Sequence, residues 1–410
     1  MRSVRWRIAY FSPLPPAHSG IADYSYELLP HLVQRADVTL FVAFPEQVAP
    51  LLRNQFAIRS IEDYPTARWE YDVALYQMGN SKYHEAVYSM LLRYPGITVL
   101  HEYFLHHLIV DCTIGHGNFA AYTREMGYAL GTEGLRLADQ VRHHQCGPPL
   151  FEIPLNERVL DSSLGVIVHS EYVQKRIRAR RPHLLTTVVP APIQSYSTPL
   201  LSRQELGFSD RALIFASAGH VTEAKQITLA LDAFVRVQND FPDALYLIIG
   251  EGSGQDMMLN AWLRQHELQN KVIYTGYIPD TRQFVSWIAA ADVLVNLRSP
   301  TVGETSATAL RGLAAGRLVI VSNDGWYAEL PDDVCVKVPP NDADALLAAM
   351  RRLAGDALLR QEMGRRATDY AYRQHDPGRV AQMYVDFIGE MLTNTANRLK
   401  TIPGVGADHA

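Results

Sequence analysis

The feature that most constrains the fold is an alternation of short apolar runs with amphipathic runs, which occurs twice along the chain. In the first half, apolar runs of strand length begin at Arg7–Phe11 and recur up to Leu185–Val189. After a break at residues 190–192, the alternation restarts at Ala212–Ala218 and continues to Val334–Val338. Strands separated by helices favour parallel sheets with helices on both faces, so the sequence predicts two α/β domains in tandem.

The predicted organisation is an N-terminal Rossmann-like domain over residues 1–190 and a C-terminal Rossmann-like domain over residues 191–375. A helix is expected within residues 376–395, after the second domain is complete, and a disordered tail within residues 396–410. Two such domains in tandem would form a cleft that faces the carboxyl ends of their strands.

Composition restricts the classes of function. The formal net charge of −5 and the pI of about 6.3 do not indicate a nucleic-acid-binding protein. The three cysteines are dispersed along the chain, which is typical of reduced thiols rather than a disulfide framework. The first residues do not resemble a signal peptide, and no apolar stretch has the length of a membrane span, so a cytoplasmic protein is expected.

The most informative stretch is residues 292–331. It predicts a strand, a polar loop, a helix and another strand, with Gly303 and Glu304 just before the helix. A helix N-terminus offers unpaired backbone N–H groups, and anions such as diphosphates bind there. Glu304 would either cap the first turn or accept hydrogen bonds from sugar hydroxyls, and this stretch alone does not separate the two.

In each half, one glycine-containing loop follows the first strand. The loop from Ser12 to Gly20 is rich in proline, and a phosphate or a sugar could approach the backbone where Gly20 opens a helix. In the loop from Gly219 to Lys225, Lys225 would supply a point charge for a diphosphate, and His220 a second donor. The first loop could also be an ordinary strand–helix turn, and Lys225 of the second could be only a surface lysine.

Two histidine clusters superficially resemble metal sites. His101 and His106 are five residues apart rather than four, which rotates them off a common helix face. His143, His144 and Cys146 lack a fourth ligand, so a solvated polar patch is the favoured interpretation.

The predicted helix at residues 174–181 is strongly basic. A solvated face is the favoured interpretation of such a charge run. The alternative is contact with anionic lipid headgroups or with a phosphorylated acceptor.

In order and spacing, several segments resemble glycosyltransferase family four, retaining enzymes of the GT-B fold. The segments that carry this resemblance are the Gly219 to Lys225 loop, IIGEGSG at Ile248 to Gly254, VIYTGYIPD at Val272 to Asp280, the stretch 292–331, SPLPPAHSGIADYS from Ser12 and VLHEY at Val99 to Tyr103. The resemblance implies an α/β protein with two Rossmann-like parallel-sheet domains facing a central cleft. It also implies that the helix within residues 376–395 crosses back to the N-terminal domain.

The resemblance also implies an activity: transfer of a sugar from a nucleoside diphosphate-sugar to an acceptor hydroxyl, with retention of anomeric configuration. The reaction is of the hexosyltransferase type and would serve surface polysaccharide or glycoconjugate synthesis. The acceptor would be a glycan, a lipid-linked molecule or another hydroxyl compound. No cofactor, bound metal or nucleic acid is implied. The protein would be cytoplasmic, with peripheral contact to the inner face of the membrane through residues 174–181.

At the level of residues, the resemblance implies catalytic roles for His101 and Glu304. The donor-binding residues that it implies are Gly20, Gly219, His220, Lys225, Gly303, Thr305, Ser306, Arg311 and Glu329. The family typically has a pair of glutamates, and counting back from Gly316 puts the second at Arg311 and the first at Gly303, one place before Glu304. Arg311 can only donate hydrogen bonds and cannot accept them from ribose hydroxyls, so Glu329 is a substitute acidic candidate.

Two other functions stay open. Arg311 suggests a GT-B domain pair that has lost turnover and serves as a sugar-nucleotide-binding scaffold or sensor. The other alternative is a GT-B epimerase or phosphorylase, which would release free nucleotide without an acceptor or depend on inorganic phosphate.

Overall fold

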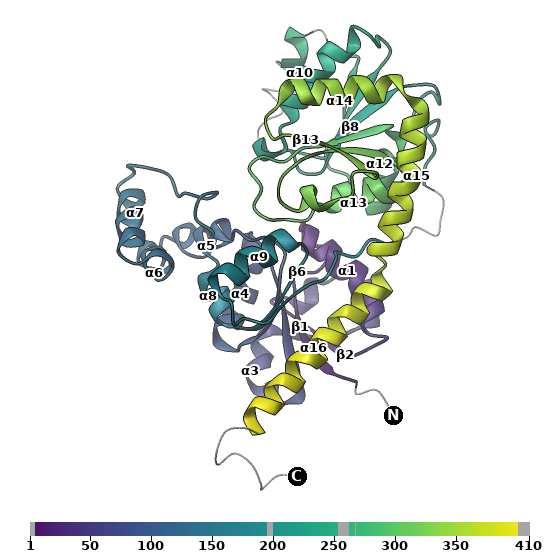
Figure 1. Cartoon of the computed structure of the whole chain (residues 1–410). Coiled ribbons are helices and arrows are strands. Elements are labelled where there is room, and N and C mark those ends of the chain that lie inside the picture. Colours follow the sequence, from purple (N-terminus) through teal and green to yellow (C-terminus); the bar gives the residue numbers. More distant parts are fainter. Residues whose placement is uncertain (1–4, 195–199, 253–261, 267, 401–410) are drawn as a thin grey trace. The chain divides into compact units, whose positions relative to one another are not determined.

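The computed structural model consists of two compact units (Figure 1). The residues that it describes are 5–194, 200–252, 262–266 and 268–400. Unit 1 comprises Met1–Pro192, Val302–Thr305 and Pro377–Ala410. Unit 2 comprises Ile193–Thr301 and Ser306–Asp376. Each unit contains one parallel sheet, so the predicted α/β class with two Rossmann-like domains is confirmed.

The sheet of unit 1 has seven strands in the order β3-β2-β1-β4-β5-β6-β7. Their bounds are β1 Arg7–Phe11, β2 Asp37–Val42, β3 Ala57–Ser60, β4 Val73–Met78, β5 Gly96–Leu100, β6 Ser163–Val168 and β7 Thr186–Val188. The strand order reverses at β1, which pairs in parallel with β2 on one side and with β4 on the other. In such sheets, ligands bind at the carboxyl ends of the strands beside the reversal.

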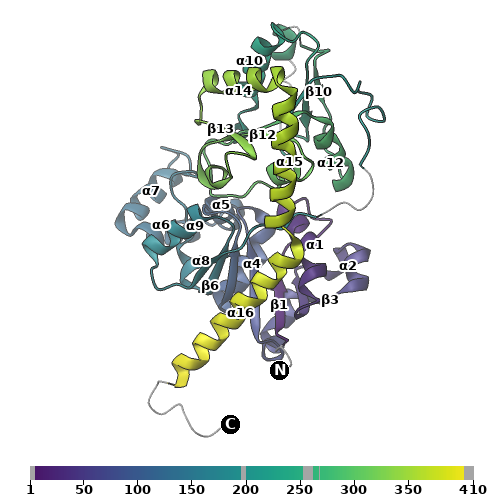
Figure 2. The same cartoon turned by 45° about the vertical axis from the view of Figure 1, so that its right-hand side comes forward.

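Alternate residues of β1 enter separate apolar clusters, because successive side chains of a strand point to opposite faces of the sheet. Ile8 and Tyr10 belong to a cluster with α1 (Gly20–Leu32) and α16 (Pro377–Lys400), whereas Phe11 belongs to the other. Figures 1 and 2 show α1 and α16 side by side on unit 1. The remaining helices of unit 1 are α2 Pro50–Gln55, α3 Tyr64–Ala67, α4 Glu85–Arg93, α5 His106–Cys112, α6 Phe119–Leu130, α7 Thr132–Arg142, α8 Glu157–Asp161 and α9 Glu171–Arg180.

The sheet of unit 2 has six strands in the order β10-β9-β8-β11-β12-β13. Their bounds are β8 Ile214–Ala218, β9 Leu245–Ile249, β10 Val272–Tyr274, β11 Val293–Asn296, β12 Leu318–Ser322 and β13 Cys335–Val338. The described helices of this unit are α10 Ile227–Gln238, α12 Thr281–Ala290, α13 Ala307–Ala314, α14 Ala343–Gly355 and α15 Ala357–Gln374. Here the strand order reverses at β8, which pairs with β9 and β11.

Some elements differ from the sequence-based expectation. The sequence did not predict β3 or α15. The helix expected within residues 376–395 extends to Lys400, and residues 401–410 of the expected tail lie outside the described residues. Ser253 and Gly254 of the IIGEGSG segment also lie outside them.

Candidate functional site

The loop after β8 brings Gly219 and Lys225 together in unit 2. Gly219 has a φ of +92°, and a Cβ built on it would lie 2.4 Å from Lys225 Nζ and 3.2 Å from Thr308 Oγ1. Lys225 ends the short 3-10 helix η6 (Glu223–Lys225) and donates a hydrogen bond to the carbonyl of Ala218. The ammonium group is therefore held beside the backbone of a glycine, at the carboxyl end of a central strand.

The carboxyl end of β11 contributes a capped helix start. Ser306 is the N-cap of α13, and its Oγ accepts a hydrogen bond from the N–H of Ala309 at 3.1 Å. Asn296 is the last residue of β11, and its Nδ2 lies 3.3 Å from Ser306 Oγ. Because Thr308 in the first turn approaches Gly219, the start of α13 and the Lys225 ammonium lie at the same end of the sheet. This end offers backbone N–H groups and a positive charge to an anion.

Gly250 fixes the loop after β9 against the loop after β8. Its φ is +130°, and a Cβ there would lie 2.5 Å from the carbonyl oxygen of Gly219. The N–H of Gly219 donates to the carbonyl of Ile249 at 2.8 Å. The two loops thus pack backbone against backbone, which leaves no room for a side chain on Gly250.

The segment Val302–Thr305 packs within unit 1. The carbonyl of Val302 accepts hydrogen bonds from the N–H groups of Tyr103, at 2.8 Å, and Phe104, at 3.1 Å. Gly303 has a φ of +80°, and a Cβ on it would lie 2.7 Å from Tyr103 Cβ. Glu304 is buried, and its Oε2 accepts from the N–H of Val302 at 2.9 Å. Since the N-cap of α13 is Ser306, Glu304 is not the capping carboxylate of that helix.

His101 is buried at the end of β5 in unit 1. Its Nε2 lies 2.7 Å from Gln77 Oε1, and its Nδ1 lies 3.2 Å from His169 Nε2. The ring of Tyr24 packs edge-on against it, with 4.6 Å between the centroids. Burial holds the pKa of His101 well below its usual range, and the neighbouring His169 and His84 lower it further. The imidazole is therefore neutral at neutral pH, with both ring nitrogens in contact with protein groups.

Gly20 is the first residue of α1 and is exposed. The preceding Ser19 caps the helix by accepting from the N–H of Ile21 at 3.3 Å. A Cβ built on Gly20 would meet no atom within 4 Å. Four residues later, Tyr24 hydrogen-bonds to the hydroxyl of Tyr384, which ties α1 to α16.

The other predicted donor-binding residues lie in unit 2, except Thr305, which belongs to the segment Val302–Thr305 of unit 1. His220 is exposed directly after Gly219. Arg311 lies in α13 and is 7% exposed. Glu329 is exposed at the end of the 3-10 helix η7 (Gly325–Glu329). Their roles stay predictions.

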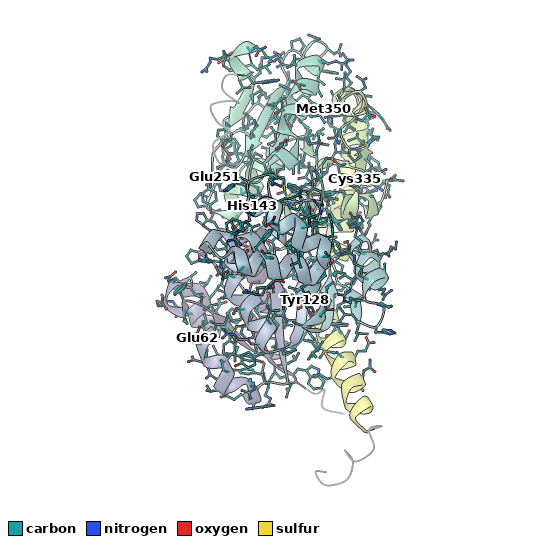
Figure 3. The ribbon with its side chains drawn as sticks, turned by 90° about the vertical axis from the view of Figure 1, so that its left-hand side faces the viewer. Glu62, Tyr128, His143, Glu251, Cys335 and Met350 are labelled. Atoms are coloured by element: carbon teal, nitrogen blue, oxygen red, sulfur yellow. The ribbon has the colours of Figure 1, made fainter. Side chains whose placement is uncertain are left out.

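His106 and His143, two of the histidines in these clusters, have other partners. His106 Nδ1 lies 2.9 Å from the carbonyl oxygen of Ile153, and its Nε2 lies 2.9 Å from Tyr122 Oη. His143, which follows α7 (Figure 3), has its Nδ1 2.9 Å from the carbonyl oxygen of Asp139. Within the described ranges of the chain, no three His, Cys, Asp or Glu side chains are grouped so that they could hold a metal ion.

The basic helix at residues 174–181 corresponds to α9 and the residue after it. Arg180 forms an ion pair with Glu157 at 3.0 Å, and Arg181 forms one with Asp161 at 2.6 Å. Both carboxylates lie in α8, so part of the basic charge holds α9 to α8. Among the helices that the structure describes, none is long and apolar enough to cross a membrane.

Sequence reasoning missed several polar residues that support these groups. Asn296 and Gln77 are buried polar residues in otherwise apolar strands. A polar residue in an apolar run could have indicated them from the sequence. His169 follows β6 as His101 follows β5, so its position after a strand could have indicated it. Thr308 carried no signal, because its approach to Gly219 depends on the folded loop.

Comparison with known protein families gives a match over most of unit 2. Residues 201–370 match the family model described as "Glycosyl transferases group 1". No curated protein matches the chain.

Comparison with solved structures covers nearly the whole chain. Alr3699/HepE of Anabaena in complex with UDP and glucose aligns with a TM-score of 0.66 and 14% identity, over 94% of this chain and 100% of that one. Sucrose-phosphate synthase of Thermosynechococcus elongatus aligns with a TM-score of 0.65 and 16% identity, over 95% and 100%. WaaG, a glycosyltransferase involved in lipopolysaccharide biosynthesis, aligns with a TM-score of 0.61 and 13% identity, over 93% and 99%. The predicted GT-B fold is therefore confirmed.

Proposed function

We propose that this chain, whose residues 201–370 match the group 1 glycosyl transferases and which has the GT-B fold, is a member of that family. We propose that it transfers a sugar from a UDP-sugar to an acceptor hydroxyl with retention of anomeric configuration. Uridine is proposed as the base because HepE, which shares the fold, was solved with UDP and with UDP-glucose. The family match lies on unit 2, which we propose as the donor-binding unit.

The observation that carries this proposal is the group formed by Gly219, Lys225 and the start of α13. It lies at the carboxyl ends of β8 and β11, which are neighbours at the strand-order reversal of unit 2. A diphosphate needs close backbone approach, N–H donors and positive charge, and this group supplies all three. Lys225 would hold the diphosphate as a point charge, with His220 as a second donor.

In the proposed transfer, the acceptor oxygen bonds to the anomeric carbon as the bond between that carbon and the diphosphate oxygen breaks. The acceptor proton passes to the leaving diphosphate, and UDP departs. Negative charge grows on the diphosphate during this step, so fixed donors there stabilise the transition state more than the ground state. Lys225 and the N–H groups around Thr305 and Ser306 are the proposed donors.

The remaining predicted residues have proposed roles in positioning. Gly20 and Gly303 would let the backbone approach the donor, and Glu304 would accept hydrogen bonds from sugar hydroxyls. Arg311 would donate where relatives have a carboxylate, and Glu329 would accept from the ribose hydroxyls.

His101 is proposed as a neutral hydrogen-bonding group toward the donor sugar or the acceptor hydroxyl. Its nitrogens contact Gln77 and His169, so a substrate contact through the ring would require one of these hydrogen bonds to be exchanged.

The acceptor is proposed to be a glycan or a lipid-linked molecule in surface polysaccharide or glycoconjugate synthesis. WaaG, which shares the fold, is involved in lipopolysaccharide biosynthesis. Peripheral membrane contact would use the basic residues of α9 that are not held by α8, such as Lys175, whose side chain is 76% exposed and pairs with Glu171 of the same helix at 3.1 Å. Co-sedimentation with anionic and neutral vesicles tests this contact. Equal recovery of protein with both vesicle types would contradict it.

The decisive experiment measures binding and turnover with a panel of UDP-, GDP- and ADP-sugars. Calorimetry should give saturable binding of UDP and UDP-sugars, and UDP release should rise when a mixture of hydroxyl acceptors is added. Absence of both binding and release across the panel would contradict the proposal. Tight binding without any product would favour the scaffold alternative, and dependence on inorganic phosphate would favour a phosphorylase.

Glu304→Ala tests the site itself. We expect kcat to fall by about 100-fold, since a lost transition-state contact typically costs about two to three orders of magnitude. Glu133→Ala removes an exposed glutamate of α7 and should leave kcat unchanged. Near-normal turnover of Glu304→Ala would reject its role.

A further inference from the structure

Unit 2 contains a pocket where α15 packs beside the end of α13 (Figure 1). Its volume is about 430 Å³, and small-molecule sites commonly have volumes of about 300–1,000 Å³. We name it the arginine pocket. Apart from alanines and glycines, the described residues that line it are Asp292, Arg317, Arg360, Gln361, Arg365 and Thr368.

The arginine pocket lies at the amino ends of the parallel strands. Asp292 directly precedes β11, and Arg317 directly precedes β12, which pairs with it. The proposed donor-binding group lies at the carboxyl ends of β8 and β11, at the opposite edge of the same sheet. α13 connects the two edges, since Ser306 caps its start and Ala315, which lines the pocket, follows its last residue. A ligand in the arginine pocket would therefore leave the proposed donor site open.

Close backbone packing fixes the shape of the pocket. Gly316 has a φ of +69°, and a Cβ built on Gly364 of α15 would lie 2.3 Å from the carbonyl oxygen of Gly316. A Cβ on Gly316 would in turn lie 3.0 Å from Thr368 Oγ1, one turn further along α15. The turn before β12 and the helix α15 are thus in direct contact, which holds Arg317 near the side chains of α15.

The acidic group of the lining already has partners. Asp292 Oδ1 lies 2.9 Å from Arg203 Nη2, and its Oδ2 accepts a hydrogen bond from the N–H of Ile214 at 2.8 Å. Both side chains of the ion pair are mostly buried, with 15% of Arg203 and 19% of Asp292 exposed. The charge of Asp292 is therefore offset by an arginine that does not line the pocket.

Arg317 and Arg360 give the pocket its positive charge. Arg317 donates to backbone carbonyls through Nε and Nη1, at 3.0 and 3.4 Å. Arg360 donates through Nη1 to two carbonyls near the end of α14. Among the described residues, neither guanidinium forms an ion pair with a carboxylate. Because a guanidinium has five N–H groups, each also keeps donors that the carbonyls do not use.

An anion would compensate this charge. Burial lowers the pKa of Arg317; Asp292 acts in the opposite direction, and Arg203 lowers the pKa further. Arg365 is 63% exposed and pairs with Glu362 and Asp369 of its own helix, so it contributes less. Arginine binds phosphate with charge-assisted hydrogen bonds, often two at a time. Arg317 and Arg360 are therefore suited to a phosphate group.

The rest of the lining favours a polar ligand. Among the described lining residues, none is aromatic or a large aliphatic, so the pocket offers little contact to a nucleotide base or a lipid chain. Gln361 is exposed on α15 and supplies an amide that can pair with hydroxyl groups.

We propose that the arginine pocket binds a small phosphorylated sugar or polyol, separate from the sugar donor. Its phosphate would lie between Arg317 and Arg360, and its hydroxyls would face Gln361. This binding does not rest on the proposed transferase function, because it uses the opposite edge of the sheet.

Calorimetry on the full chain tests the binding with glucose 6-phosphate, inorganic phosphate and glucose. We expect glucose 6-phosphate to bind about tenfold more tightly than inorganic phosphate, since its hydroxyls add hydrogen bonds. Glucose, which lacks the charge, should show no measurable binding. The affinity for glucose 6-phosphate should fall as salt is added, because the contact is between charges.

Arg360→Gln removes one cation of the pocket and keeps an amide that can donate. It should weaken glucose 6-phosphate by about tenfold or more, because a hydrogen bond to a charged group is lost. Arg352→Gln is the matched control, since Arg352 is exposed on α14 and does not line the pocket. Equal affinity of both variants would contradict the role of Arg360.

Gln361→Glu keeps the test decisive if Arg360→Gln does not fold. The side chain is exposed and nearly unchanged in shape, so the fold should tolerate it. The added negative charge should weaken glucose 6-phosphate by about tenfold. Gln361→Ala, which adds no charge, should weaken it by less than about threefold. If Gln361→Glu binds as the wild type does, the phosphate is not in the arginine pocket.

The proposed donor site also attracts phosphate, through Lys225, and the variants separate the two sites. If Lys225→Ala abolishes the binding of glucose 6-phosphate and Gln361→Glu does not, the pocket proposal is wrong. If the proposal is right, saturating UDP should leave the affinity for glucose 6-phosphate unchanged. If inorganic phosphate binds as tightly as glucose 6-phosphate, the sugar part of the proposal is wrong.

The remaining outcomes separate this inference from the proposed function. If no phosphate probe binds while UDP-sugars bind and turn over, the pocket proposal is wrong and the transferase proposal stands. If glucose 6-phosphate binds and responds to Gln361→Glu but no nucleotide sugar binds, the arginine pocket stands and the transferase proposal fails.

Discussion

The loops after β1 and β8 each contain a glycine near the carboxyl end of the central strand, but the two glycines are there for different reasons. Gly219 in unit 2 has a left-handed φ of +92°, and its missing Cβ is the space that the Lys225 ammonium occupies. Gly20 in unit 1 opens a helix, and a Cβ there would meet no protein atom within 4 Å. Unit 2 therefore needs its glycine to build the loop, whereas unit 1 can need it only for a ligand.

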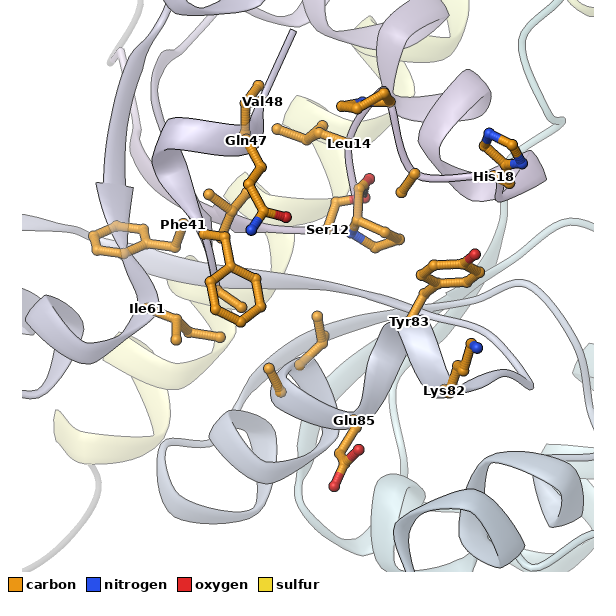
Figure 4. Close-up of a pocket in the computed structure, with 18 of the residues that line it drawn as sticks. Ser12, Leu14, His18, Phe41, Gln47, Val48, Ile61, Lys82, Tyr83 and Glu85 are labelled. Carbon is orange, nitrogen blue, oxygen red and sulfur yellow. Dashed lines mark hydrogen bonds between the residues drawn. The ribbon is translucent and has the colours of Figure 1, made fainter. Parts of the chain in front are cut away.

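The two loops also differ in how closely the protein packs around them. The loop in unit 2 is packed by backbone contacts with Gly250 and holds a cation. The loop in unit 1 borders a pocket of about 830 Å³ (Figure 4). The loop of unit 2 is thus built around a fixed cation, and the loop of unit 1 is not.

The largest effect is expected from Lys225→Ala. Removing the ammonium should lower kcat/KM for the UDP-sugar by about 100- to 1,000-fold, because charge that develops on the diphosphate loses its fixed partner. Steady-state UDP release measures the loss. Lys271→Ala is the matched control: Lys271 is also in unit 2, donates to the carbonyl of Pro242 at 2.7 Å and should tolerate the change. A loss below about fivefold for Lys225→Ala would reject the phosphate role.

Gly219→Ala should have the next largest effect. The new Cβ would displace Lys225 Nζ, which costs little stability because that atom ends a flexible side chain, but it moves the charge. We expect kcat/KM to fall by about 10- to 100-fold and stability to fall by about 1–3 kcal/mol from the left-handed backbone. Kinetics and urea denaturation measure the two effects. Unchanged kinetics would show that the position of Lys225 is not critical.

Gly20→Ala should give a smaller effect with a different signature. Alanine is favoured over glycine in a helix by up to about 1 kcal/mol, and no protein atom opposes the Cβ, so stability should be unchanged or higher. If a ligand approaches the backbone at Gly20, kcat/KM should still fall by about tenfold. A stable variant with full activity would remove Gly20 from the donor site.

Much of the fold could be predicted because buried parallel strands are continuous apolar runs. Strands such as β1 and β5 are buried along most of their length, and their sequences show it. β3 was missed because Ala57–Ser60 is a short strand at the sheet edge, exposed or half-buried throughout. α15 was missed because its sequence is largely polar, although Asp356 caps it by accepting from the N–H of Leu359 at 2.8 Å.

The candidate site was only partly predictable. Glycines and a lysine at strand ends could be read from the sequence, because their positions follow the strand pattern. The packing of Val302–Thr305 on Tyr103 could not, since it joins segments about 200 residues apart through backbone hydrogen bonds. Backbone contacts of this kind depend on the fold and leave little trace in residue identity.

Unit 1 also contains buried histidines that respond to pH. Burial lowers the pKa of His84 to about 4, and that of His106 to about 4. His84 Nδ1 lies 3.0 Å from the carbonyl oxygen of Gln77, and its buried Nε2 has no hydrogen-bond partner among the described residues. A proton added at Nε2 would therefore be buried without an acceptor, which explains the direction of the shift.

The smallest expected effect is the part of the stability loss at acid pH that is due to His84. The pKa of His84 is lowered in the folded protein, so the unfolded chain binds the proton first as the pH falls below about 6.5. The free energy of unfolding therefore decreases from about pH 6.5 down to about pH 4. At pH 5.5, one unit below the unfolded pKa, the cost should be about 1.4 kcal/mol. His84→Gln keeps a donor for Gln77 but does not titrate, so its loss of stability between pH 7.5 and 5.5 in urea denaturation should be smaller by about that amount. His183→Gln, at an exposed histidine of unit 1, is the control. If both variants lose stability in parallel with the wild type, the buried ring of His84 does not contribute to the acid lability of unit 1.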